Sequence, residues 1–146
     1  FIRITKEGTI KIYGRSDSTL NPGGVRIGTS EIYRVVESID AIEDSLAIGQ
    51  EHDGDQRIIL FLLMKNNILL NERIVDEIKS LIKVNCTPRH VPEKILETSG
   101  IPYTINGKKV EDAVKKVING EEVLNLDALS NPETLNFYKN IIELKN

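Results

Sequence analysis

The stretch RIILFLLM, residues 57–64, contains the longest apolar run in the chain and decides the fold. Ile58 to Met64 has the length of a strand and falls far short of the roughly 20 residues of a membrane span. Such an unbroken run is expected of a central strand that is covered on at least one face. A second strand is predicted over 42–50, before the polar turn at 52–55.

Helical periodicity surrounds this pair of strands. The stripe over 72–83 is the clearest, and Asn71 is placed to cap that helix. Thr29 or Ser30 can cap the first helix, and Ser130-Asn131-Pro132-Glu133 is typical of a capping box that opens the last one. Helices are therefore predicted over four ranges: 30–39, 72–83, 109–118 and about 130–143.

Two β-hairpins are predicted before the first helix. Residues 1–13 alternate about a turn that contains Gly8, and residues 19–27 flank the turn Asn21-Pro22-Gly23-Gly24. A short third strand is predicted over 94–98. The order of elements predicts the α+β class: a small domain with a β-hairpin and a short, about three-stranded sheet covered by helices.

Composition limits the classes of function. The chain has 146 residues with a net charge of −3, which argues against nucleic acid as the main partner because such binding usually leaves a basic face. No apolar run suits a membrane. Cys86 is the only cysteine, which excludes an intrachain disulfide and fits a reducing, cytoplasmic location. Because Phe1 is not an initiator methionine, we expect this chain to be a piece of a longer one.

Common catalytic machinery does not occur in the sequence. There is no phosphate-binding loop of the P-loop type and no dinucleotide fingerprint. Cys86 and His90 lie four residues apart, but Pro88 disrupts a helical metal face and no further ligand is nearby. We therefore predict no metal site. A Cys–His nucleophile is disfavoured as well, since nothing in the sequence orients the pair.

Two basic features could bind an anionic substrate. Arg15 and Arg26 flank a glycine-rich turn, where guanidinium groups and freed N–H groups can hold phosphate or carboxylate oxygens. Lys108 follows a turn from which a long side chain can project. Composition alone favours solvated side chains in each case. A catalytic Lys108 requires a dry site for its ammonium, and a second domain must supply it.

Two motifs in order resemble those of the adenylate-forming enzymes, which include acyl-CoA synthetases, peptide-synthetase adenylation domains and luciferases. GRSD at 14–17 with GVRI at 24–27 is similar to their hinge motif, and Pro102, Thr104, Gly107 and Lys108 are similar to their C-terminal lysine motif. The resemblance covers essentially the whole chain and narrows to the acetoacetate-activating members. Three longer stretches narrow it: 14–33, 106–123 and 129–141.

The resemblance implies a domain division and a two-step reaction. Residues 1–16 would be an end-piece of a large N-terminal adenylation domain, and residues 17–146 a mobile C-terminal domain with a tail at 121–146. ATP and Mg²⁺ would activate a carboxylate, with release of pyrophosphate, and coenzyme A would then displace AMP. The partner would be the chain's own N-terminal domain, so this piece alone would be inactive.

The resemblance also implies residue roles. Lys108 would be the adenylation lysine, and Lys109 a neighbour without that role. Asp17 would be the hinge residue. Tyr103 departs from the family, because many relatives have a lysine there, and Ser18 replaces a common acidic residue. The nucleotide would be contacted by Arg15 and Arg26. Coenzyme A would be contacted by Gly24, Arg26 and Lys83.

Other functions stay open at this point. The parent could be another short-chain acyl-CoA synthetase, acting on acetate or propionate. The chain could instead be a free-standing, non-catalytic binding module. By analogy with relatives, acetylation of Lys108 could serve as a regulatory switch, because it would neutralise the ammonium.

Overall fold

The computed structural model describes residues 2–4, 10–12 and 19–144. Strands β1 (Ile2–Ile4) and β2 (Ile10–Ile12) pair antiparallel, with Ile2 opposite Ile12, so the first predicted hairpin is confirmed. The second is confirmed as well. Strands β3 (Thr19–Leu20) and β4 (Ile27–Gly28) pair antiparallel on either side of the 3₁₀ turn η1 (Pro22–Gly24).

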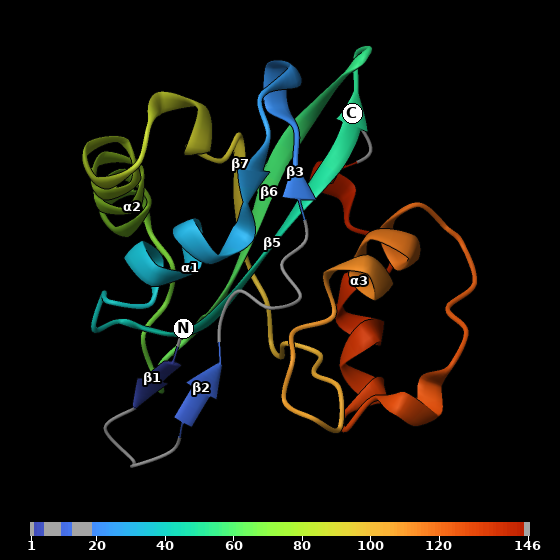
Figure 1. Ribbon diagram of the computed structural model, residues 1–146. Helices are drawn as coiled ribbons and strands as arrows, with labels where there is room; N and C mark the ends of the chain where they lie inside the picture. Colours follow the sequence, from blue (N-terminus) through green and yellow to red (C-terminus); the bar gives the residue numbers. More distant parts are fainter. Residues whose placement is uncertain (1, 5–9, 13–18, 145–146) are drawn as a thin grey trace.

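The central sheet has the strand order β5-β6-β7. Strands β5 (Ile42–His52) and β6 (Asp55–Met64) are antiparallel, and β7 (Lys94–Glu97) runs parallel to β6 (Figure 1). The two long strands extend further than predicted because only two residues separate them. Asp53 and Gly54 both have positive φ, at 51° and 79°, which suits a tight hairpin turn.

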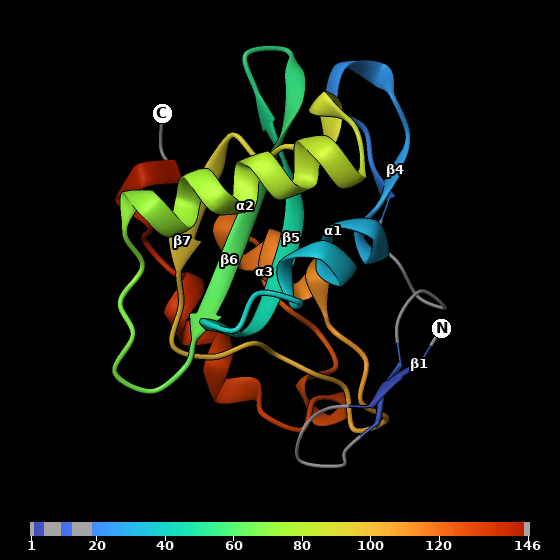
Figure 2. The same ribbon diagram turned by 90° about the vertical axis from the view of Figure 1, so that its left-hand side faces the viewer.

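Helices cover both faces of this sheet. Helices α1 (Thr29–Val36) and α2 (Glu72–Asn85) lie on one face, and α3 (Glu111–Ile118) and the tail lie on the other (Figures 1 and 2). Alternate residues of β6 enter two separate cores: Ile58, Leu60 and Leu62 face α1 and α2, whereas Ile59 and Phe61 face α3 and the tail. The unbroken apolar run of β6 is thus explained by burial on both faces. The α+β class is confirmed.

The predicted helix caps have different outcomes. Asn71 caps α2, since its side chain accepts a hydrogen bond from the Ile74 N–H at 3.0 Å. For α1 the prediction was wrong: Gly28 occupies the cap position, with no side-chain cap. Thr29 is instead the first helical residue, and its hydroxyl donates to Glu111 at 3.3 Å. The Thr29 hydroxyl therefore makes a tertiary contact instead of capping the helix.

The predicted last helix was also wrong. The tail forms three short 3₁₀ segments instead: η3 (Leu126–Ala128), η4 (Pro132–Tyr138) and η5 (Ile142–Leu144). Asn131 makes no side-chain cap, because its amide is bonded to the segment before Lys108. Tyr138 anchors the tail: its hydroxyl donates to Gly100 O at 2.6 Å, and its ring meets Phe61 edge-on at 4.9 Å between centroids.

Within the part of the chain that the structure describes, no helix has the length and apolarity to cross a membrane.

Candidate functional site

Predicted site residues fall into three groups. Arg15 and Asp17, the predicted nucleotide contact and hinge, lie outside the described residues. Gly24, Arg26 and Lys83 are exposed, the first two between β3 and β4 and the last in the final turn of α2. Lys108 is exposed on a turn that precedes α3.

Two hydrogen bonds between Thr104 and Lys108 close the Lys108 turn. The Thr104 N–H donates to Lys108 O at 2.8 Å, and the Lys108 N–H donates to Thr104 Oγ1 at 3.1 Å. Gly107 has a φ of 84°, a conformation that favours glycine. The lysine motif therefore builds a short, closed hairpin that holds its lysine away from the core.

The two adjacent lysines have opposite environments. Tyr103 and Lys109 pair as an antiparallel bridge at the base of the turn. Successive side chains of extended backbone point to opposite sides, so Lys108 faces outward where Lys109 faces the sheet. The Lys109 side chain is only 9% exposed. The geometry of this bridge, rather than the amino-acid composition, therefore determines which of the two lysines is exposed and which is buried.

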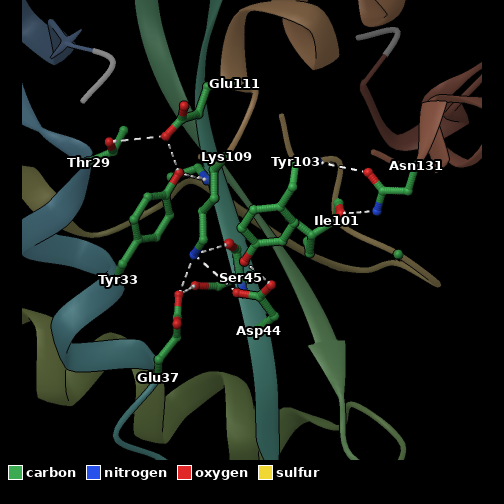
Figure 3. Close-up of polar contacts among 12 residues, drawn as sticks. Thr29, Tyr33, Glu37, Asp44, Ser45, Ile101, Tyr103, Lys109, Glu111 and Asn131 are labelled. Atoms are coloured by element: carbon green, nitrogen blue, oxygen red, sulfur yellow. Dashed lines mark hydrogen bonds and ion pairs between the residues drawn. The ribbon is translucent and has the colours of Figure 1, made fainter. Parts of the chain in front are cut away.

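Lys109 is held by groups from α1 and β5 (Figure 3). Its Nζ lies 2.5 Å from Glu37 Oε2 and 3.1 Å from Asp44 Oδ1, and it donates to Ser45 O at 2.6 Å. The ammonium also lies 3.7 Å from the ring centroid of Tyr33. Burial alone lowers the pKa of Lys109, but the Asp44 and Glu37 carboxylates more than offset it and raise that pKa. The ammonium therefore stays charged.

A third buried carboxylate lies beside this cluster. Glu111, the first residue of α3, accepts from the Tyr33 hydroxyl at 2.7 Å and from Thr29 at 3.3 Å. Burial raises the pKa of Glu111, partly opposed by the hydrogen bond from Tyr33. Burial and the Glu111 charge likewise raise the pKa of Tyr33. These contacts join α1 to the start of α3.

The other predicted binding residues gather at a different end of the domain. The η1 turn lies at the end that holds the β5–β6 turn, and the segment that follows α2 lies beside it (Figures 1 and 2). Arg89 from η2 (Pro88–His90) reaches over Gly23, where a Cβ would lie 2.5 Å from Arg89 Nη1. Space beside Gly24 is open: a Cβ there would meet no described atom within 4 Å.

The Lys108 turn lies at the opposite end of the sheet. Both views place residues 100–109 away from the β3–β4 turn, near the β1–β2 hairpin (Figures 1 and 2). Gly24 and Lys108 therefore cannot face one small substrate at the same time from a rigid domain.

Cys86 and His90 do not form a metal site with the groups around them. His90 lies between Thr87 Oγ1, at 2.7 Å from Nδ1, and Glu31 Oε2, at 2.8 Å from Nε2, so its ring ties η2 to α1. Cys86 Sγ is 3.8 Å from Glu31 O. Among the described residues, no group of three or more His, Cys, Asp or Glu side chains could hold a metal ion.

Comparison with known proteins decides the family. No family model matches the sequence. The chain is 56% identical over 142 residues to acetoacetyl-CoA synthetase of Gallus gallus and 48% identical over 145 residues to that of Rhizobium meliloti (strain 1021), covering 97% and 99% of this chain. A solved acetoacetyl-CoA synthetase from Streptomyces lividans superposes with a TM-score of 0.79 at 37% identity, covering 99% of this chain and 22% of that one.

This chain belongs to the acetoacetyl-CoA synthetase family. It spans about one fifth of the length of the relatives it matches, 21% for the chicken protein and 22% for the bacterial one. The matched region is a C-terminal portion of these synthetases, so the resemblance inferred from the two motifs is confirmed.

Three residues of this acetoacetyl-CoA synthetase portion were missed by the sequence analysis. Lys109 was interpreted only as a neighbour without the adenylation role, and its burial was not predicted. Tyr103 departs from the adenylate-forming pattern, and its hydroxyl donates to Asp44 Oδ2. Asp44 lies inside the predicted strand 42–50, at a position that is buried in the structure. A charged residue at a buried strand position was the available signal, because such groups are rarely buried unless paired.

Proposed function

We propose that this chain is the C-terminal domain of an ATP-dependent acetoacetate–CoA ligase. In the first half-reaction an acetoacetate carboxylate oxygen bonds to the α-phosphorus of ATP, and the bond to pyrophosphate breaks. In the second, the deprotonated sulfur of coenzyme A bonds to the acyl carbon, and the bond to the AMP oxygen breaks. In this proposal, residues 1–16 are the end of the large N-terminal domain, and residues 17–146 form the mobile C-terminal domain. A cytoplasmic location stays a prediction.

One observation carries this proposal: Lys108 is exposed on a closed turn while its neighbour is buried. With the described residues, the Lys108 side chain makes no hydrogen bond or ion pair, so its ammonium is free to meet a group from elsewhere. An ammonium aimed at carboxylate and phosphate oxygens stabilises the charge that develops as they react. We assign the adenylate-forming step to Lys108.

The opposite end of the domain is assigned to the second half-reaction. Gly24 lines the path of the pantetheine arm, and Arg26 and Lys83 supply positive charge for coenzyme A phosphates. Arg26 also approaches the nucleotide. Arg15 contacts the nucleotide and Asp17 is the hinge, both as predictions outside the described residues. The distance between the two exposed ends supports a domain that turns between the steps.

ATP and coenzyme A are the proposed co-substrates, and Mg²⁺ accompanies ATP in the first step. The ion neutralises phosphate charge when bound. None of the described residues is assigned to it.

The test is Lys108→Ala in the full-length enzyme. Pyrophosphate exchange dependent on acetoacetate should fall by about 10²- to 10³-fold, as when a preorganised charge-stabilising group is removed. Thioester formation from supplied acetoacetyl-adenylate should be kept. Lys116→Met, an exposed lysine of α3, is the matched control and should leave both steps unchanged. Unchanged exchange in Lys108→Ala would remove the assigned role.

Substrate profiling of the same enzyme tests the acid. Acetoacetate should be preferred over acetate and propionate. Preference for either of the latter would assign the chain to another short-chain acyl-CoA synthetase, and no activity with any acid would favour a binding module.

A further inference from the structure

Two flanking chain segments, which contain Tyr103 and Lys109, form the base of the Lys108 turn. The two residues are paired, and their side chains meet at Asp44 (Figure 3). Lys109 Nζ lies 3.1 Å from Asp44 Oδ1, and the Tyr103 hydroxyl donates to Asp44 Oδ2. One carboxylate of β5 therefore binds both flanking segments of the turn.

A second contact fixes Lys109 to α1. Its Nζ lies 2.5 Å from Oε2 of Glu37, the residue that ends this helix, and it donates to Ser45 O at 2.6 Å. An ammonium has three hydrogens, and Glu37, Asp44 and Ser45 O accept all three. The base of the turn is thus bound to a helix and to the central sheet at one atom.

The charges of this cluster depend on one another. Glu37 and Asp44 are 1% and 8% exposed, so two carboxylates face one ammonium largely out of water. Removal of the ammonium would leave like charges close together with no counter-charge, which is strongly unfavourable in a buried site. Lys109 therefore cannot leave its position while the domain stays folded, unlike a surface lysine.

We propose that Lys109 is a positioning residue for the adenylate-forming step, because it fixes the base of the turn that carries Lys108. This inference rests on the proposed function of Lys108. Lys109 itself touches no substrate. The fixed flanking segments determine how far and in which direction the Lys108 side chain extends. A displacement of about 1 Å at a reacting centre can lower the rate by about 100-fold.

The test uses the full-length enzyme with Lys109→Met, which keeps length and apolar volume and removes the charge. The kcat of pyrophosphate exchange should fall by about 10- to 100-fold with a smaller change in the KM for ATP. Thioester formation from supplied acyl-adenylate should stay within about 2-fold, since that step does not use Lys108. Equal loss of both steps, or loss of neither, overturns the positioning role.

A milder variant keeps the proposal testable if Lys109→Met does not fold. Tyr103→Phe removes only the hydroxyl that binds Asp44. It should lower exchange by about 2- to 10-fold, the rate equivalent of one hydrogen bond, without affecting thioester formation. Unchanged exchange in that variant would count as refutation. Lys116→Met serves as control.

The two hypotheses fail differently. If Lys108→Ala keeps exchange, the role proposed for Lys108 is wrong, and the inference about Lys109 fails with it. If Lys108→Ala loses exchange but folded Lys109→Met and Tyr103→Phe keep it, only the inference about Lys109 is overturned.

Discussion

Tyr103 and Lys109 face each other across the base of the Lys108 turn and both bind the carboxylate of Asp44. This shared partner makes the turn part of the sheet rather than a loose connection. The exposed tip carries the charge proposed for chemistry, and the buried base carries charges that hold structure. Stability measurements can test the second part without any substrate.

Lys109→Met should destabilise the 146-residue chain by about 3–5 kcal/mol, because it leaves Glu37 and Asp44 buried without a counter-charge. Urea denaturation followed by circular dichroism measures the free energy of unfolding. Lys116→Met, at an exposed position, should change it by less than about 0.5 kcal/mol. A loss for Lys109→Met no larger than that of the control would contradict the buried network.

Stability should depend on pH through Glu111. Burial raises the pKa of Glu111 above its ordinary value of 4.5, so the folded state binds this proton more tightly than the unfolded chain. The contribution of Glu111 to stability is therefore full below the ordinary pKa and is lost as the pH rises through the raised one. Glu111→Gln stays neutral and should lack this loss.

The measured quantity is the free energy of unfolding of the wild type minus that of Glu111→Gln. We expect it to fall as the pH rises from about 4.5 toward 8. A difference that is constant over this range would show that Glu111 keeps its ordinary pKa.

Gly24→Ala tests the coenzyme A end in the full-length enzyme. The domain itself has room for the methyl group, although a φ of 80° costs a non-glycine residue about 1–2 kcal/mol. Thioester formation should fall by about 10-fold or more if the pantetheine path is narrowed, and pyrophosphate exchange should be kept.

Gly120→Ala is the matched control for this variant. Its φ is 76°, and the space around it is equally open. Equal effects of the two variants on thioester formation would assign the loss to backbone strain rather than to a blocked path.

Asn131→Ala should destabilise the chain by about 1–3 kcal/mol, because it leaves polar backbone groups unpaired. The Asn131 amide accepts from the Tyr103 N–H and donates to Ile101 O, both at 2.9 Å. Hydrogen exchange at Tyr103 should quicken as well. Asn136→Ala, an exposed residue of the same tail, should have little effect, and equal losses for the two would exclude a specific role for Asn131.

Much of the fold could be predicted because periodicity reports burial directly. The unbroken run of β6, the helical stripe of α2 and its Asn71 cap all appear at the predicted places. The strands of both hairpins follow from alternation about turn residues. Each of these signals is local, so a single sequence is enough to detect it.

The misassigned elements depend on contacts between distant residues. Asn131 has the pattern of a helix start, but its side chain binds a segment about 30 residues earlier. Thr29 can cap a helix, but Glu111 takes its hydroxyl. The buried role of Lys109 required the register of its pairing with Tyr103, which no local pattern contains. Composition treats both lysines alike.

The tail of short 3₁₀ segments has a consequence for how the domain is made. Such segments lack the cooperativity of a long α-helix, so they depend on side chains such as Tyr138 and Leu135 docking onto a sheet that already exists. The tail also leaves the ribosome after everything it binds. During synthesis, the segment that Asn131 binds should therefore stay loosely held until the tail has been made and has docked, so a well-formed Lys108 turn should appear only after residues 131–144 have left the ribosome.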